Sequence, residues 1–205
     1  MKKKIVFGIL LALLLTGCGQ KVVTVADIQS GDDQKNDYIE MKEFEIKHGV
    51  VEETEDKVRY CALLIPAGYM PSEEVEGMYV HEKSPLDSSN IYYTVSEGDM
   101  ISKELTEEIY EETVENAFLD EGWDVDLQVE TFEEIDMEGI PGYKIRSSYQ
   151  LDDSEIEQLA YLILAEETYT ITYSQMADDE LMADFDISGD EIRLIRNEES
   201  SMARR

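Results

Sequence analysis

The sequence predicts an α+β fold over residues 44–196, in which an antiparallel β-sheet is flanked by helices. Three observations support this class. Short segments alternate apolar and polar side chains, as half-buried strands do. The turns between several of these segments are too short for a crossover, so neighbouring strands are expected to pair antiparallel. One long amphipathic helix separates two groups of strands and helical segments close the chain, which is typical of a sheet covered by helices.

Four short strands are predicted before the long helix. They cover residues 44–50, 58–65, 77–81 and 91–95. The second of these is the strongest, and Pro66-Ala67-Gly68-Tyr69 ends it because Pro and Gly interrupt regular structure. The fourth, Ile91-Tyr92-Tyr93-Thr94-Val95, is rich in β-forming side chains and follows a loop over residues 84–90.

The long helix is predicted over residues 104–121. Its apolar face, at about 100° per residue, consists of Ile109, Tyr110, Thr113, Val114, Ala117 and Phe118. Glu108, Glu111, Glu112 and Glu115 fall on the opposite face, which we interpret as solvated rather than as an ion or partner surface. Gly122 follows as a natural helix end, and Trp123 is expected to be a packing residue.

A second group of strands follows the helix. Strands are predicted over residues 125–135, 143–149, 156–165 and 169–173, with turns at 136–142 and 166–167. The nearly continuous apolar character of residues 156–165 indicates a central strand. Residues 178–185 are predicted as a short helix with acids at its positive end. Ser188 is expected to N-cap a final turn or two that carries Ile192 and Ile195.

The N-terminus has the layout of a signal peptide, predicted over residues 1–17. Three lysines, Lys2 to Lys4, precede an apolar run from Ile5 to Leu15, and a run of about eleven residues is far too short for the ~30 Å bilayer core. Leu15-Thr16-Gly17-Cys18 resembles a bacterial lipobox. That resemblance implies diacylglycerol on the Cys18 sulfur and cleavage before Cys18. The alternative is an ordinary secretory signal with an incidental cysteine.

Residues 18–43 are predicted to be the lipidated cysteine and a flexible tether, because their composition is polar and weakly patterned. A flexible chain of about 24 residues has an r.m.s. reach of roughly 25–30 Å. The short apolar segment Val22-Val23-Thr24-Val25 is alternatively a strand or a docking segment. At the other end of the chain, residues 197–205 are predicted to be a disordered tail.

The charge of the chain excludes some partners. Its formal net charge is −31, and removal of Lys2, Lys3 and Lys4 with no acidic residue brings the mature chain to −34. Such a charge disfavours nucleic acid, which requires basic patches, and is repelled by an anionic membrane surface. The anchor must therefore be the lipid itself, and stable anchoring takes two acyl chains such as palmitate.

The sequence predicts no catalytic residues, no metal site and no cofactor. Of the two cysteines, Cys18 is assigned to the lipid, and Cys61 alternates with Leu63 and Ile65 as a buried, inert thiol. Two histidines far apart in sequence make a histidine-based metal site improbable. HExxH, CxxC, P-loop, GxSxG and GxGxxG motifs are absent. Acidic clusters such as 152–155 and 178–180 are expected by chance among 48 acids.

The order of elements resembles the PsbP-like fold over about residues 44–196. The residues that carry the resemblance are Ile65-Pro66-Ala67-Gly68-Tyr69, the loop before Asn90-Ile91, the long helix, the segment 136–143, the strand 169–173 and the tail 178–195. This fold is shared by an extrinsic subunit of photosystem II, a yeast Ran-binding protein and many bacterial lipoproteins. The resemblance implies an α/β/α sandwich and a binding or assembly role, with no catalytic residues to transfer.

These observations favour a membrane-anchored, extracytoplasmic lipoprotein of the bacterial cell envelope with a non-catalytic binding or assembly domain and an unknown partner. A second hypothesis is a binder of cations or of an envelope polymer through the acidic surface. An extracytoplasmic hydrolase is the third.

Overall fold

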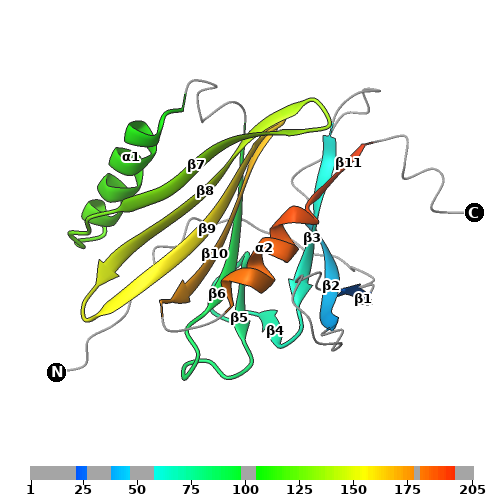
Figure 1. The fold of residues 1–205 in the computed structure, drawn as a ribbon, viewed down its shortest axis with the longest axis horizontal. Coiled ribbons are helices and arrows are strands. Elements are labelled where there is room, and N and C mark those ends of the chain that lie inside the picture. The colour runs from blue at the N-terminus through cyan, green and yellow to red at the C-terminus, as the bar shows by residue number, and fades with distance from the viewer. Residues whose placement is uncertain (1–21, 27–37, 47–57, 98–104, 178–180, 197–205) are drawn as a thin grey trace, which may run out of the picture.

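The computed structural model describes residues 22–26, 38–46, 58–97, 105–177 and 181–196, and its strands form two antiparallel sheets. One sheet has seven strands in the order β4-β5-β6-β10-β9-β8-β7 and the other has four in the order β1-β2-β3-β11. Figure 1 shows α2 lying across the seven-stranded sheet, with α1 beside β7 at one end of the molecule and β1 and β2 at the other. Among the described residues, no helix is long and apolar enough to cross a membrane.

The strand bounds follow the alternating segments of the sequence. The strands are β1 Val22–Ala26, β2 Tyr38–Ile46, β3 Val58–Pro66, β4 Tyr69–Pro71, β5 Met78–His81, β6 Asn90–Glu97, β7 Gln128–Met137, β8 Ile140–Leu151, β9 Ser154–Leu164, β10 Glu167–Met176 and β11 Arg193–Arg196. The helices are α1 Glu107–Asp120 and α2 Met182–Asp190. The predicted strands at 58–65, 77–81, 91–95, 156–165 and 169–173 are therefore confirmed.

The main core lies between the two sheets and beneath α2. Its largest fully buried members include Leu63 on β3, Ile91 on β6, Ile163 on β9, Tyr173 on β10 and Phe185 on α2. Burial of each such side chain contributes about 1.5–3 kcal/mol.

A second core covers the opposite face of the seven-stranded sheet on the side of α1. The even-numbered residues from Ala160 to Leu164 on β9 belong to it, whereas Leu159, Tyr161 and Ile163 belong to the main core. The strand is thus apolar on both faces, which explains the continuous apolar run of the sequence and confirms its central position.

The predicted α+β class with an antiparallel sheet is confirmed, but the arrangement of helices around it differs from the predicted sandwich. The main core is closed by α2 together with strands from the four-stranded sheet, so a second sheet occupies much of the place expected for a helical layer. The continuous apolar pattern of β3, where Cys61 to Ile65 are all buried, does not distinguish a strand of the main sheet from a strand of a second sheet.

The region predicted as a flexible tether over residues 18–43 contains strand β1 and the start of strand β2. The tether prediction is therefore wrong for these segments, and the alternative of a strand near residues 22–25 is correct. Val22 to Ala26 pair antiparallel with Lys42 to Tyr38, so residues that are too few to form a core alone extend an existing sheet. The predicted signal peptide and the tail at 197–205 lie outside the described residues.

The C-terminal end of the domain also differs from its prediction. Ser188 does not cap a new helical turn, because it lies inside α2, where it is buried. The segment that carries Ile195 is strand β11, which pairs antiparallel with β3. Alternation in Ile192, Leu194 and their neighbours is too short to distinguish a strand from a helical turn by pattern alone.

Helix α1 confirms the predicted helix with shorter bounds. The Thr106 hydroxyl accepts a hydrogen bond from the Ile109 backbone N–H at 3.3 Å and caps its start. At its end Gly122 adopts φ +88°, and the N–H groups of Gly122 and Trp123 bond the carbonyls of Leu119 and Phe118. This is a Schellman motif, and it confirms Gly122 as the helix end.

The buried face of α1 is rotated from the predicted one. Tyr110 is buried and Val114 and Phe118 pack on the second core, but Ile109 is 49% exposed. The buried face consists of residues four apart, Tyr110, Val114 and Phe118, and Glu111 and Glu115 lie partly buried at its margin. The glutamates on that side are therefore not all solvated.

Candidate functional site

The sequence-predicted site residues Leu15, Thr16, Gly17 and Cys18 lie outside the described residues. Cys61 lies on β3 and is fully buried in the main core, as predicted. Burial raises the pKa of the Cys61 thiol to about 12, so the reactive thiolate is suppressed at neutral pH.

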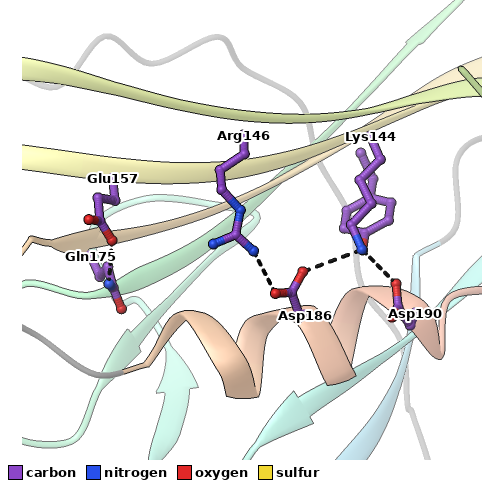
Figure 2. Close-up of polar contacts among 7 residues, drawn as sticks. Lys144, Arg146, Glu157, Gln175, Asp186 and Asp190 are labelled. Atoms are coloured by element: carbon purple, nitrogen blue, oxygen red, sulfur yellow. Dashed lines mark hydrogen bonds and ion pairs between the residues drawn. The ribbon is translucent and has the colours of Figure 1, made fainter. Parts of the chain in front are cut away.

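A cluster of ion pairs holds α2 against the sheet, and sequence reasoning did not anticipate it (Figure 2). Lys144 and Arg146 alternate on β8 and both reach α2, where Asp186 and Asp190 lie one helical turn apart. Lys144 Nζ lies 2.8 Å from Asp190 Oδ1 and 3.3 Å from Asp186 Oδ1. Arg146 Nη2 lies 2.5 Å from Asp186 Oδ2. We call these four side chains the α2 ion-pair cluster.

The charges in the α2 ion-pair cluster satisfy one another. Burial opposes the charge on Lys144, but its hydrogen bonds and charge interactions with Asp190 and Asp186 outweigh this effect and raise its pKa. The Tyr161 hydroxyl adds a hydrogen bond to Asp190 Oδ1 at 3.0 Å. Two cations and two carboxylates therefore neutralise each other, and the cluster serves to fix α2.

Buried hydroxyl groups attach α2 to both sheets. The Ser188 hydroxyl donates to the Leu64 carbonyl on β3 and lies 2.9 Å from the Tyr173 hydroxyl on β10. Because the single Ser188 proton goes to Leu64, the Tyr173 hydroxyl donates to Ser188. Full burial raises the pKa of Tyr173 well above its usual value, which keeps this proton in place.

The start of α2 is fixed by Gln175 on β10. Its Nε2 donates to Glu157 Oε2 at 2.8 Å, as Figure 2 shows, and its Oε1 accepts a hydrogen bond from the Leu181 backbone N–H at 2.9 Å. Leu181 has no capping side-chain oxygen, so Gln175 supplies the acceptor from another element. The helix is therefore held at its start, along its length and at its end.

A second polar cluster joins a histidine, an aspartate, a serine and a tyrosine around the β5–β6 loop. Asp87 Oδ1 accepts hydrogen bonds from the Ser89 N–H at 3.0 Å and from the Ser89 hydroxyl at 2.5 Å. The Tyr69 hydroxyl lies 2.7 Å from Ser89 Oγ and acts as the donor, since the Ser89 proton is already used. His81 Nδ1 lies 2.8 Å from Asp87 Oδ2, but no well-directed hydrogen bond joins them.

The connectivity of this cluster differs from that of a catalytic triad. Nucleophilic catalysis requires a histidine that takes the serine proton and an acid that orients the histidine. Here Asp87 lies between Ser89 and His81, and Ser89 is buried. Burial opposes ionisation of Asp87, but the Ser89 hydrogen bonds and the charges of His81 and Lys83 lower its pKa overall. The cluster consequently holds a carboxylate that shapes the loop.

One signal in the sequence was available for this cluster. Asp87-Ser88-Ser89 has the spacing at which an aspartate side chain accepts the N–H two residues later, an Asx turn. The contacts of His81 and Tyr69 with that turn depend on the pairing of β4 with β5, which places Tyr69 opposite His81. Local sequence carries no information about that register.

One glutamate of the predicted solvated face of α1 makes a structural hydrogen bond. Glu115 on α1 accepts a hydrogen bond from the Leu127 backbone N–H at 3.0 Å, so this glutamate fixes the approach to β7. Among the described residues, no group of three or more His, Cys, Asp or Glu side chains is placed to hold a metal ion. Trp123, expected to pack, is 42% exposed at the end of α1.

Comparison with known proteins supports the fold alone. No protein-family model and no curated protein matches the chain. The solution structure of cyanobacterial PsbP (CyanoP) from Synechocystis sp. PCC 6803 is similar, with 14% sequence identity, a TM-score of 0.52, and coverage of 66% of this chain and 86% of that one. The expected PsbP-like fold is therefore confirmed. The function of the chain has to be argued from its own residues.

Proposed function

We propose that the protein is a bacterial lipoprotein, held at the outer surface of the membrane by lipid on Cys18, with a non-catalytic binding or assembly domain. The observation that carries this proposal is the order of residues 1–18: lysines, a short apolar run, Leu15, two small residues and Cys18. Residues 1–17 are then the signal peptide that is removed. The palmitate-type acyl chains of the diacylglycerol, with a further chain on the new N-terminus where the cell adds one, supply stable anchoring.

The non-catalytic part of the proposal is supported by the way nucleophilic groups are held. The Cys61 thiol is buried with a raised pKa. The hydroxyl protons of Ser89 and Ser188 are both committed to oxygen acceptors within the fold. Because these groups are buried, they lack the access to a substrate that nucleophilic catalysis requires. These groups stabilise the domain, and we infer that its surface carries the function.

The anchoring is tested by Cys18→Ala in the full-length chain expressed in a bacterium. Cys61→Ala is the matched control, because it removes the other cysteine and leaves the lipobox intact. The wild type and the control are expected to enter the detergent phase and to carry a lipid-sized mass increase on the N-terminal peptide. Cys18→Ala is expected to lose both. Unchanged partitioning of Cys18→Ala would contradict the anchor.

The binding role is tested by crosslinking in intact cells followed by recovery of the anchored protein. A specific partner is expected to be recovered with the wild type and lost when its contact surface is substituted. Consistent failure to recover any partner, together with turnover of a small substrate by the purified domain, would contradict a non-catalytic role.

The net charge of −31 favours a second candidate function, the binding of cations or of a basic envelope polymer. Calorimetric titration with calcium in physiological salt tests it. Saturable heat would support a specific site, whereas heat that disappears as salt is raised indicates only screening of a diffuse negative surface.

A further inference from the structure

The first strand begins very close to the proposed lipid anchor. Strand β1 starts at Val22, so only Gly19, Gln20 and Lys21 separate it from Cys18. A fully extended chain spans at most ~3.3–3.6 Å per residue, which places Val22 no more than about 14 Å from Cys18. This limit is well below the reach of roughly 25–30 Å that a flexible tether of about 24 residues would have.

The position of β1 in the fold then determines which end of the domain is near the membrane. Val22 pairs with Lys42 of β2, and Lys42 pairs with Ile65 of β3, so β1 is the outer strand of the four-stranded sheet. Figure 1 shows β1 at one end of the long axis and α1 at the other. An anchor attached beside β1 therefore brings one particular end of the molecule to the lipid.

The composition of β1 fits a covered edge. In the described part of the chain β1 pairs only with β2, and its sequence Val-Val-Thr-Val-Ala contains no charge and no proline. The other sheet has two edge strands: β7 carries Glu130, Glu133, Glu134 and Asp136, and the three-residue strand β4 ends in Pro71. Charged residues normally protect an exposed strand edge, and an uncharged edge is normally covered. Residues 19–26 contain Lys21 and no acid in a chain of 48 acids, so this segment itself is not repelled by anionic lipid.

We propose that the β1 rim, residues Val22–Ala26, lies against the headgroup region of the membrane that holds Cys18, with α1 directed away from it. This inference rests on the proposed lipidation of Cys18. The short linker between Cys18 and Val22 causes this orientation, because it holds the rim at the lipid surface. The α1 end is then the face presented to a partner.

The test uses fluorescence quenching by brominated lipid. The full lipidated chain is purified from membranes and reconstituted into vesicles of brominated phosphatidylcholine with phosphatidylglycerol. The chain has a single tryptophan, Trp123, beside α1, which reports on the distal end. Thr24→Trp in a Trp123→Phe background reports on the rim, and Lys21→Trp provides the same readout from outside the strand if the first variant misfolds. A third protein carries 20 Gly/Ser residues inserted between Lys21 and Val22.

Quenching is expected to be several-fold stronger at the rim reporter than at Trp123, and to fall to the level of Trp123 after the insertion. Equal quenching at both ends, or no quenching at the rim, would overturn the proposal, as would quenching that survives the insertion. Crosslinking of rim to rim between two chains would assign the edge to a second copy instead. The mass of the N-terminal peptide separates the two proposals, because a lipidated protein with an unquenched rim refutes only this one.

Discussion

The clearest perturbation of the fold is Gly189→Ala at the end of α2. The added Cβ would contact Tyr161 Cε2 and would lie 2.5 Å from its Cζ and 2.6 Å from its hydroxyl oxygen. The ring has little freedom to move, because its hydroxyl bonds Asp190 at 3.0 Å and the ring lies edge-on to Tyr173. The chain must therefore separate α2 from the sheet or displace the ring.

The expected cost follows from three contributions. Overpacking of a filled core costs about 1–3 kcal/mol. Loss of the hydrogen bond from Tyr161 to the charged Asp190 costs about 1.5–3 kcal/mol. The better helix propensity of alanine returns about 0.8–1 kcal/mol. The free energy of unfolding should fall by roughly 2–5 kcal/mol, which moves a urea midpoint by roughly 1–2.5 M for an m-value of about 2 kcal/mol/M.

Urea denaturation followed by circular dichroism measures this change. The control is the same substitution in a Tyr161→Ala background, where the space is open and Gly189→Ala should be neutral or stabilising by up to about 1 kcal/mol. A single Gly189→Ala variant as stable as the wild type would refute the reasoning, as would an equal loss in the two backgrounds.

Three further predictions concern pH, the ion-pair cluster and α1. Burial raises the pKa of the Cys61 thiol to about 12, and burial, followed by the charge of Tyr110, raises the pKa of the Tyr149 hydroxyl to about 12. Each group therefore contributes fully to the free energy of unfolding below its unfolded-state pKa, and that contribution is lost as pH rises toward 12. The urea midpoint of the wild type should fall above about pH 9, and that of Cys61→Ala should fall less steeply. Parallel curves of midpoint against pH for the two proteins would contradict this prediction. Asp186→Asn should cost about 1 kcal/mol or less because its pairs are partly exposed, and thermal melts should show that cost shrinking with salt. Glu115→Ala should cost about 1–3 kcal/mol and speed exchange of the Leu127 amide, whereas Glu115→Gln retains an acceptor and should cost less.

The sequence was most informative where pattern and burial depend on the same residues. Cys61, Leu63 and Ile65 alternate, and all three are buried in the main core. Residues 159–164 are apolar throughout because both faces of this part of β9 are covered. Gly122 ends α1 because a positive φ is required there.

The sequence was least informative where a residue's role depends on a distant partner. Ser188 has the chemistry of an N-cap, but its partners are Leu64 and Tyr173, far away along the chain. The α2 ion-pair cluster likewise requires β8 and α2 to be adjacent, a fact of topology. The strand at Val22 is too short to be assigned by pattern, since its stability comes from pairing with β2.

The pairing of β11 with β3 constrains the order in which the chain can fold. Residues 193–196 complete a sheet that begins far earlier, and the bond between Ser188 and Leu64 spans 124 positions. Contacts of such long range slow folding, because a large loop must close before they form. During synthesis the N-terminal strands emerge first, and β3 remains without its neighbour β11 until residues 193–196 have been made. A completely folded domain therefore requires that synthesis has continued through β11.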